Sequence, residues 1–244
     1  MQQGQQFYRE LAQYYDELFP VDPAAVDFIR GRVSGGRPLL DAACGTGGHV
    51  IALEGHGVDT YGIDNSPEMI EIAQNRRPDR FELMDMRNLA EHGRAPFSLV
   101  YSIGNSLSHL PLPGDVAAFL ARVYDSLVPE GSAIFQIIDV GDLEDGTVYP
   151  LPTQSGTHAR MERTYTIDGE ARDGVAQVSF EAQLYLGDDV DPRPISQRLL
   201  ALSPDKIRLM MKDEGFREIE VRDGFSGNRY SESSSRTAVI VGRR

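Results

Sequence analysis

The chain has 244 residues, of which 41% are hydrophobic, so it can bury the core of one large domain or of a domain with an embedded lobe. Its formal net charge of −13 at pH 7 disfavours a nucleic-acid substrate, because an acidic surface repels phosphate backbones. The one cysteine, Cys44, permits no disulfide within the chain. We find neither a signal peptide nor an apolar run of about 18 residues, and we expect a cytoplasmic protein without a membrane partner.

Residues 1–36 are predicted to form a helical cap. Phe7, Leu11 and Leu18 recur at the spacing of a helix, which Pro20 ends. A second helix is predicted over residues 21–33, before a Ser-Gly-Gly turn.

The stretch over residues 38–73 has the pattern of strand, glycine turn, helix, strand and helix. A short buried strand ends at Asp41, and the glycines at positions 45, 47 and 48 form a turn that lets a ligand approach the backbone. A helix to residue 54 and a second strand over residues 59–63 follow, and Asp64 stands at the end of that strand. We expect the turn to lie at the surface of a crevice, where a bulky residue at position 47 would block the ligand and leave the fold intact.

The spacing of acidic residues and glycines in this stretch indicates the kind of ligand. Asp64 follows Gly45 by 19 residues, about the distance at which an acidic side chain reaches ribose hydroxyls in a nucleotide-binding unit. The order Asp-x-x-x-Gly-x-Gly, which begins at Asp41, differs from the G-x-G-x-x-G of a dinucleotide site. A carboxylate at Asp41 suits a ligand with a positive charge or N–H donors. These features weaken two alternatives, a dinucleotide-dependent oxidoreductase and a glycine turn that binds nothing.

Strands and helices continue to alternate downstream. A helix is predicted over residues 114–127, and strands are predicted over residues 80–84, 97–103 and 132–139. Repeated strand–helix units predict an α/β fold with a parallel sheet and right-handed crossovers.

The pattern changes after residue 141 to three strand-like runs, which predict an antiparallel lobe. These runs cover residues 158–167, 175–186 and 195–203, with turn signals at Asp168-Gly169 and Gly187-Asp188 between them. A helix is predicted to start near Ser203 and to end at Gly215, before a last pair of strands over residues 216–221 and 235–241. We therefore predict a single domain over residues 1–244. Its parts are the cap (1–36), a ligand-binding core (37–140 and 204–244) and an inserted β lobe (141–203).

Two sequence segments carry a resemblance to a known family. LLDAACGTGG at residues 39–48 and GIDNSPEMI at residues 62–70 closely resemble the glycine-rich signature of the class I S-adenosylmethionine (SAM)-dependent methyltransferases. The departure is Ala43, where the family commonly has glycine. The resemblance implies a Rossmann-like fold, in which a seven-stranded, mostly parallel sheet has an antiparallel last strand and helices on both faces. It also implies SAM as the cofactor.

The resemblance assigns cofactor contacts to positions of this sequence. In the family, acidic residues after the second and third strands hold the ribose and the adenine amino group, which matches Asp64 and Asp85. A segment of the form A-x-x-Y-D, which lies over the cofactor in many relatives, matches Ala12, Tyr15 and Asp16. Alternatively, Asp85 only caps a helix and the first helix only packs on the sheet. The implied cofactor-binding set is Tyr15, Asp41, Ala43, Gly45, Gly47, Asp64, Asn65, Met69, Asp85, Met86 and Ile103.

The segment GNSLSHL at residues 104–110 resembles the corresponding part of the glycine N-methyltransferases and their relatives that methylate small amines. In that family the Asn and His lie between cofactor and acceptor, which implies that Asn105 and His109 are catalytic. We expect the Asn105 amide to accept a hydrogen of the amine, and His109, with a pKa near 6.5, to take the proton that the amine sheds. Alternatively, His109 is structural.

Methyl transfer by in-line displacement needs alignment and exclusion of water more than a charged catalytic centre, and we expect no metal site. The core motifs account for the cofactor alone, so the lobe is expected to bind the acceptor. Four arginines of the lobe are candidate carboxylate clamps: Arg160, Arg163, Arg193 and Arg198. Alternation along a strand sends Arg160 and Arg163 to opposite faces. Tyr8, Asn105, His109 and Tyr230 complete the acceptor-binding set.

The sequence thus predicts an enzyme that transfers a methyl group from SAM to a small polar acceptor, an amine or amino-acid nitrogen. Within enzymes, the alternatives are O-, S- or C-methylation in secondary metabolism. From another class, the alternative is a regulator that binds SAM without turnover.

Overall fold

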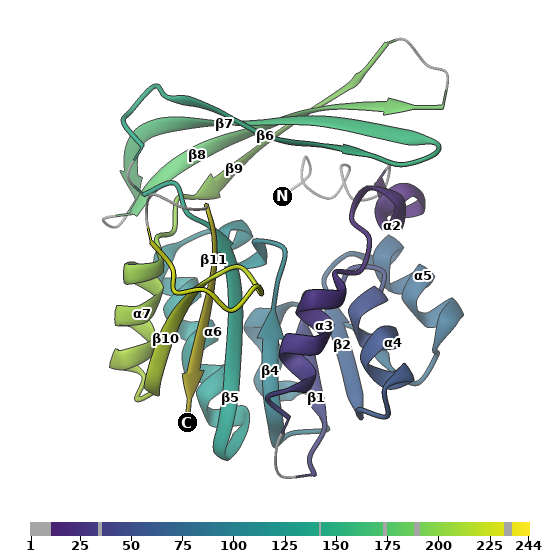
Figure 1. Ribbon diagram of the computed structural model, residues 1–244, viewed down its shortest axis with the longest axis vertical. Helices are drawn as coiled ribbons and strands as arrows, with labels where there is room; N and C mark the ends of the chain where they lie inside the picture. The colour runs from purple at the N-terminus through teal and green to yellow at the C-terminus, as the bar shows by residue number, and fades with distance from the viewer. Residues whose placement is uncertain (1–10, 34–35, 142, 173–174, 188–190, 232–235) are drawn as a thin grey trace.

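The computed structural model describes the chain except residues 1–10, 34–35, 142, 173–174, 188–190 and 232–235. It consists of a sheet covered by helices and, above it, a second, smaller sheet (Figure 1). None of the described helices is long and apolar enough to span a membrane.

The large sheet has seven strands in the order β10-β11-β5-β4-β1-β2-β3. Five strands run parallel: β1 (Leu39–Ala42), β2 (Thr60–Asp64), β3 (Phe81–Leu83), β4 (Phe97–Ser102) and β5 (Leu127–Ile138). The last strand, β11 (Thr237–Arg243), is antiparallel to both of its neighbours, β5 and β10 (Arg217–Asp223). The predicted Rossmann-like sheet is therefore confirmed.

Helices cover both faces of this sheet. On one face, α6 (Pro113–Ser126) and α7 (Pro204–Asp213) pack on strand residues such as Leu40 and Val100. On the other, α3 (Pro23–Arg30) and α4 (Gly48–Gly55) pack on Leu39 and Leu99. The helix α5 (Pro67–Arg76) packs beside α4 around Phe81.

Local sequence fixes where several helices begin. The side chains of Ser66 and Ser203 accept hydrogen bonds from the N–H groups of Met69 (3.4 Å) and Lys206 (3.3 Å), and a proline follows each serine. Such a pair caps the helix and fixes φ at its first residue. Asp22 and Pro23 do the same for α3, which therefore begins two residues later than the predicted helix over residues 21–33.

The small sheet is antiparallel, in the order β6-β7-β8-β9: β6 (Val148–Ser155), β7 (Ala159–Arg172), β8 (Val175–Leu186) and β9 (Arg193–Leu200). We predicted three strands and missed β6, because Pro150 and Pro152 interrupt its strand pattern. Prolines are tolerated here because β6 is an edge strand. The turn predicted at Asp168-Gly169 is wrong. At that point β7 continues through a register shift between Ile167 and Ala171, and Gly169 has a φ of +57°.

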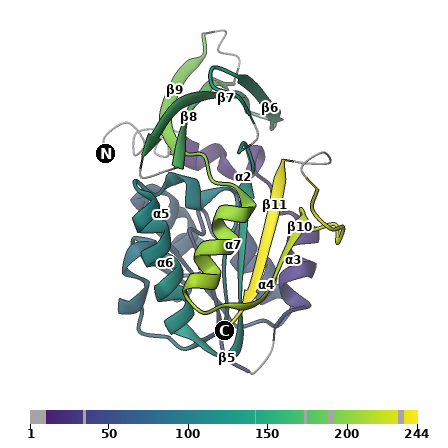
Figure 2. The same cartoon turned by 90° about the vertical axis from the view of Figure 1, so that its left-hand side faces the viewer.

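The described part of the N-terminal segment, which includes α2, lies between the two sheets (Figure 2). The single helix predicted to end at Pro20 is, in its described part, a 3-10 turn, η1 (Ala12–Tyr14), followed by a short helix, α2 (Tyr15–Leu18). Leu11 and Leu18 are fully buried in the apolar cluster of the small sheet. Because both sheets pack against it, tertiary contacts decide the conformation of this segment.

Candidate active site

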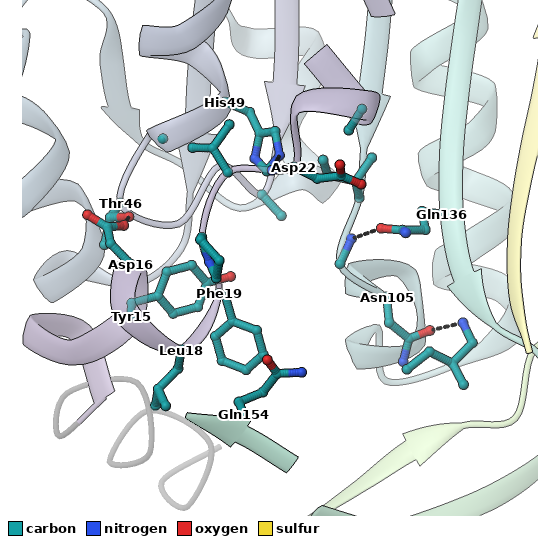
Figure 3. A pocket seen from close by; sticks show the side chains of 18 of the residues that line it. Tyr15, Asp16, Leu18, Phe19, Asp22, Thr46, His49, Asn105, Gln136 and Gln154 are labelled. Atoms are coloured by element: carbon teal, nitrogen blue, oxygen red, sulfur yellow. Dashed lines mark hydrogen bonds between the residues drawn. The ribbon is translucent and has the colours of Figure 1, made fainter. Parts of the chain in front are cut away.

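A pocket of about 450 Å³ opens where the carboxyl ends of β1 and β4 meet α2 and the small sheet. In Figure 3, Tyr15, Leu18 and Phe19 lie on one side of the pocket and Asn105 and Gln136 on the other. The core contributes Asp41, Ala43, Cys44, Thr46, Ile103, Gly104, Asn105 and His109, and β6 and β7 contribute Gln154, Met161, Arg163 and Tyr165.

The glycine turn needs its glycines for two different reasons. Gly45 and Gly47 have φ values of +54° and +82°, which favour glycine. A Cβ on Gly47 would lie 2.2 Å from the ring of the buried Phe81, so the turn packs directly against β3. Ala43 also has a positive φ, +104°, which explains why glycine suits this position in relatives.

Two carboxylates, the buried Asp41 and the half-buried Asp64, flank the turn. Asp64 accepts hydrogen bonds from the N–H groups of Gly45 (2.8 Å) and Ser66 (2.9 Å), and burial raises its pKa. Asp41 is 2% exposed, and its Oδ1 makes no hydrogen bond with any described residue. Burial raises the pKa of Asp41 well above its usual range, the adjacent Tyr101 hydroxyl opposes this shift, and the nearby Asp64 carboxylate adds to it. A cationic N–H donor in the pocket would satisfy that oxygen.

Side-chain contacts hold the N-terminal segment across the glycine turn. The ring of Tyr15 lies over Gly45, where an added Cβ would be 3.2 Å from the ring. Asp16 bonds to Thr46 and to Arg76 of the core. On the side of the small sheet, Glu17 accepts a hydrogen bond from the N–H of His158 (2.8 Å). The segment therefore covers the turn as a lid that joins both sheets.

The remaining predicted cofactor residues lie beyond the pocket, around β2 and β3. Asp85 caps η2 (Met86–Glu91) and forms an ion pair with Arg87 (2.6 Å), which lowers the pKa of this carboxyl. Met86 packs against the core. Met69 is buried, whereas Asn65 is exposed at the tip of the β2–α5 loop.

Asn105 joins three parts of the molecule. It precedes η3 (Ser106–His109) in a left-handed conformation. Its Oδ1 accepts hydrogen bonds from the Ile138 N–H (2.9 Å) and from Ser108 Oγ (3.0 Å), and its Nδ2 donates to the Tyr165 hydroxyl (3.0 Å). Both lone pairs of the amide oxygen are therefore used inside the protein. The Asn105 side chain lines the pocket. Because its amide oxygen is already occupied, these hydrogen bonds suit a role in holding the pocket wall in place better than the predicted role of accepting an amine hydrogen.

His109 ends η3 and lines the pocket opposite the glycine turn. Its Nδ1 lies 3.2 Å from the side-chain amide of Gln197 on β9. Burial lowers the pKa of His109 to about 4 and not near 6.5 as predicted. The imidazole is consequently neutral at physiological pH.

Only one of the four predicted arginines lines the pocket. Arg163 does so, on the same face of β7 as Met161 and Tyr165. Arg160 points the other way, as alternation predicted, and stacks on Tyr185 with its guanidinium 4.1 Å from the ring centre. Arg193 and Arg198 are exposed on β9 and lie outside the pocket.

Of the two tyrosines in the predicted acceptor-binding set, Tyr230 lies outside the pocket. Tyr230 donates a hydrogen bond to Asp139 in a separate groove, because β10 and β11 carry it away from the carboxyl ends of β1 and β4. Tyr8 lies outside the described residues.

Sequence reasoning missed several pocket residues that belong to other elements: Phe19, His49, Gln136, Gln154 and Tyr165. Gln136 on β5 accepts a hydrogen bond from the Gly104 N–H (2.8 Å), which fixes the loop after β4 (Figure 3). Alternation along β7 would have found Tyr165, because it lies two residues from Arg163.

Comparisons with known proteins find similarity to methyltransferases. A family model described as a methyltransferase domain matches residues 39–131. The glycine/sarcosine N-methyltransferase of Aphanothece halophytica is 28% identical over 202 residues, which are 78% of this chain and 70% of that protein. The dTDP-3-amino-3,4,6-trideoxy-alpha-D-glucopyranose N,N-dimethyltransferase of Streptomyces venezuelae is 33% identical over 111 residues, 45% of this chain and 46% of that protein.

Among solved structures, the CcbJ methyltransferase from Streptomyces caelestis has a TM-score of 0.80 at 22% identity and covers 97% of both chains. SAM-bound CalS10, an amino pentose methyltransferase from Micromonospora echinaspora, has a TM-score of 0.68 at 22% identity over 95% of both chains. The fold is that of the class I Rossmann-like methyltransferases, and the sequence matches are to proteins named as methyltransferases. The chain is a SAM-dependent methyltransferase, as the glycine-rich signature predicted.

Proposed function

We propose that this enzyme methylates the nitrogen of a small amine. The observation that carries the proposal is a pocket that joins the glycine turn and the unsatisfied Asp41 to Asn105, His109 and the inner face of β7. Its size of about 450 Å³ suits a small acceptor beside the reactive end of the cofactor. The similarity to proteins named as glycine/sarcosine and amino-sugar N-methyltransferases supports nitrogen as the acceptor atom.

SAM supplies an activated methyl group and a neutral thioether leaving group. We assign its ammonium to Asp41, its ribose hydroxyls to Asp64 and its adenine to the Asp85–Met86 segment, with Tyr15 as the lid over the turn. The buried Oδ1 of Asp41 fits this assignment because it needs a donor. The chain's own contribution to rate is then alignment and exclusion of water, which together can lower a barrier by about 7–11 kcal/mol.

We assign to His109 the orientation of the acceptor amine. The Nε2 group of Gln197 faces Nδ1 of His109 and can only donate, so it binds the Nδ1 lone pair and favours the tautomer of His109 that carries its hydrogen on Nε2. The imidazole, held in one orientation, forms a wall of the acceptor site and limits the directions in which the amine lone pair can face. With a pKa of about 4, His109 is too weak a base to collect the proton of an ammonium product.

The substitution His109→Gln separates orientation from base catalysis. We expect kcat to fall about 10- to 100-fold with the affinity for SAM unchanged, since the lost contact orients the acceptor only. Above pH 5 the parent and the variant should show the same pH profile, because a group with a pKa of about 4 is already neutral there. A fall in the parent's rate around pH 6.5, absent in the variant, would instead establish His109 as a base.

Matched acceptors test the function itself. The enzyme is incubated with SAM and with glycine, sarcosine or ethanolamine, and in parallel with glycolate and mercaptoacetate, which replace the amine by a hydroxyl or a thiol. S-adenosylhomocysteine (SAH) is quantified by mass spectrometry. We expect SAH with one or more amines and none with the other acceptors. Turnover with the hydroxyl or thiol compounds alone, or tight SAM binding without turnover of any amine, would overturn the proposal.

A further inference from the structure

Arg163 is the only arginine or lysine among the described residues that line the pocket. The Arg163 residue is half-buried, and its guanidinium lies 5.3 Å from the centre of the Phe19 ring. One nitrogen, Nη2, donates to the Pro152 carbonyl (2.8 Å). The Nε is buried and makes no hydrogen bond with any described residue. A buried cationic donor without an anionic partner is costly, so its retention points to a ligand.

The surroundings hold this guanidinium in place. With its amide turned over, Gln154 accepts from Nη2 of Arg163 (2.8 Å) and donates to the Leu18 carbonyl (2.9 Å). The arginine is thereby fixed between β6 and the lid, and burial lowers its pKa. No described carboxylate pairs with it, in contrast to Arg160, which pairs with Glu162.

Charge is distributed unevenly across the pocket. The wall at the carboxyl end of β1 carries the unsatisfied Asp41, whereas the wall formed by β7 carries Arg163. Among the described residues, the pocket has two other acidic side chains: Asp16 is paired with Arg76, and Asp22 caps α3 by accepting the Ala24 N–H (2.9 Å). A ligand that extends across the pocket therefore meets a carboxyl group at one end and a guanidinium at the other.

We propose that Arg163 binds an anionic group of the methyl acceptor, so that the substrate is a small amine bearing a carboxylate or a phosphate. This inference rests on the proposed N-methyltransferase function and names its substrate class. The guanidinium recognises either anion by charge-assisted hydrogen bonds from its Nε side. The same contact directs the amine away from β7, toward His109 and the cofactor.

Anion binding to the SAH-loaded enzyme tests this without methyl transfer. The melting temperature is measured in sodium acetate and in sodium phosphate, each against sodium chloride at equal ionic strength, for the parent, Arg163→Met and Arg160→Met. We expect acetate or phosphate to stabilise the parent and Arg160→Met alike, and to bind Arg163→Met about tenfold more weakly or worse. The stronger of the two anions distinguishes an amino-acid from a phosphorylated acceptor.

Three results would overturn the inference. The first is a parent that responds to neither anion beyond chloride, and the second is an equal response of Arg163→Met. The third is a loss of SAH affinity in Arg163→Met, measured by calorimetry, since that would assign the arginine to the carboxylate of the cofactor. If Arg163→Met does not fold, Arg163→Lys takes its place, because it keeps the charge but loses Nε. Failure of N-methylation would appear in the acceptor panel and leave these anion measurements unchanged.

Discussion

Replacing Asp64 by alanine is expected to weaken SAM binding by about 2–4 kcal/mol, roughly 30- to 900-fold. The carboxylate stands at the end of β2 and already accepts the N–H groups of Gly45 and Ser66. Its remaining lone pairs are placed to accept the ribose hydroxyls, and its loss also frees the glycine turn. Isothermal titration of SAM into the parent and Asp64→Ala measures the difference.

The matched control is Asp59→Ala, because Asp59 directly precedes β2, at the end of the strand opposite Asp64, and is mostly exposed. It should bind SAM as tightly as the parent. Equal affinities for Asp64→Ala and the parent would show that the ribose is held elsewhere.

The substitution Gly47→Val is expected to lower the free energy of unfolding by about 2–5 kcal/mol and to abolish SAM binding. We expected from the sequence that the fold would tolerate this change, and the structure contradicts that expectation. A side chain at this position collides with the ring of Phe81, which is buried among Val50, Ile70 and Ala73. The positive φ of +82° adds backbone strain.

Gly57→Val provides the control for backbone strain alone. Gly57 has a φ of +79°, and an added Cβ there meets no atom within 4 Å. Urea denaturation should therefore show a clearly smaller loss for Gly57→Val than for Gly47→Val, with SAM binding retained. If the free energy of unfolding falls equally in both variants, the collision with Phe81 contributes nothing to the loss of stability.

The core could be predicted from the sequence because its signals are local. The Asp41 and Asp64 spacings, the glycine turn and the Ser-Pro helix starts each depend on a few neighbouring residues, and each lies where predicted. The strand β6 was missed because its prolines are acceptable only at an edge, which is a property of the sheet and not of the segment.

The chemistry of the site depends on contacts between residues that lie far apart in the sequence, which local sequence patterns do not reveal. The low pKa of His109 arises from burial under the small sheet, and the Asn105 oxygen is occupied by Ile138, 33 residues away. Likewise, alternation placed Arg160 and Arg163 on opposite faces, but only the packing of α2 against β6 and β7 shows which face encloses the pocket.

The position of the transferred methyl group is the most direct test of nitrogen methylation. The enzyme is supplied with SAM labelled with carbon-13 in the methyl group and with the best amine of the acceptor panel, and the product is examined by carbon NMR. We predict that the label is bound to nitrogen, in an amount equal to the SAH formed. A label on oxygen, sulfur or carbon, or SAH formed without a labelled amine, would contradict the proposed function.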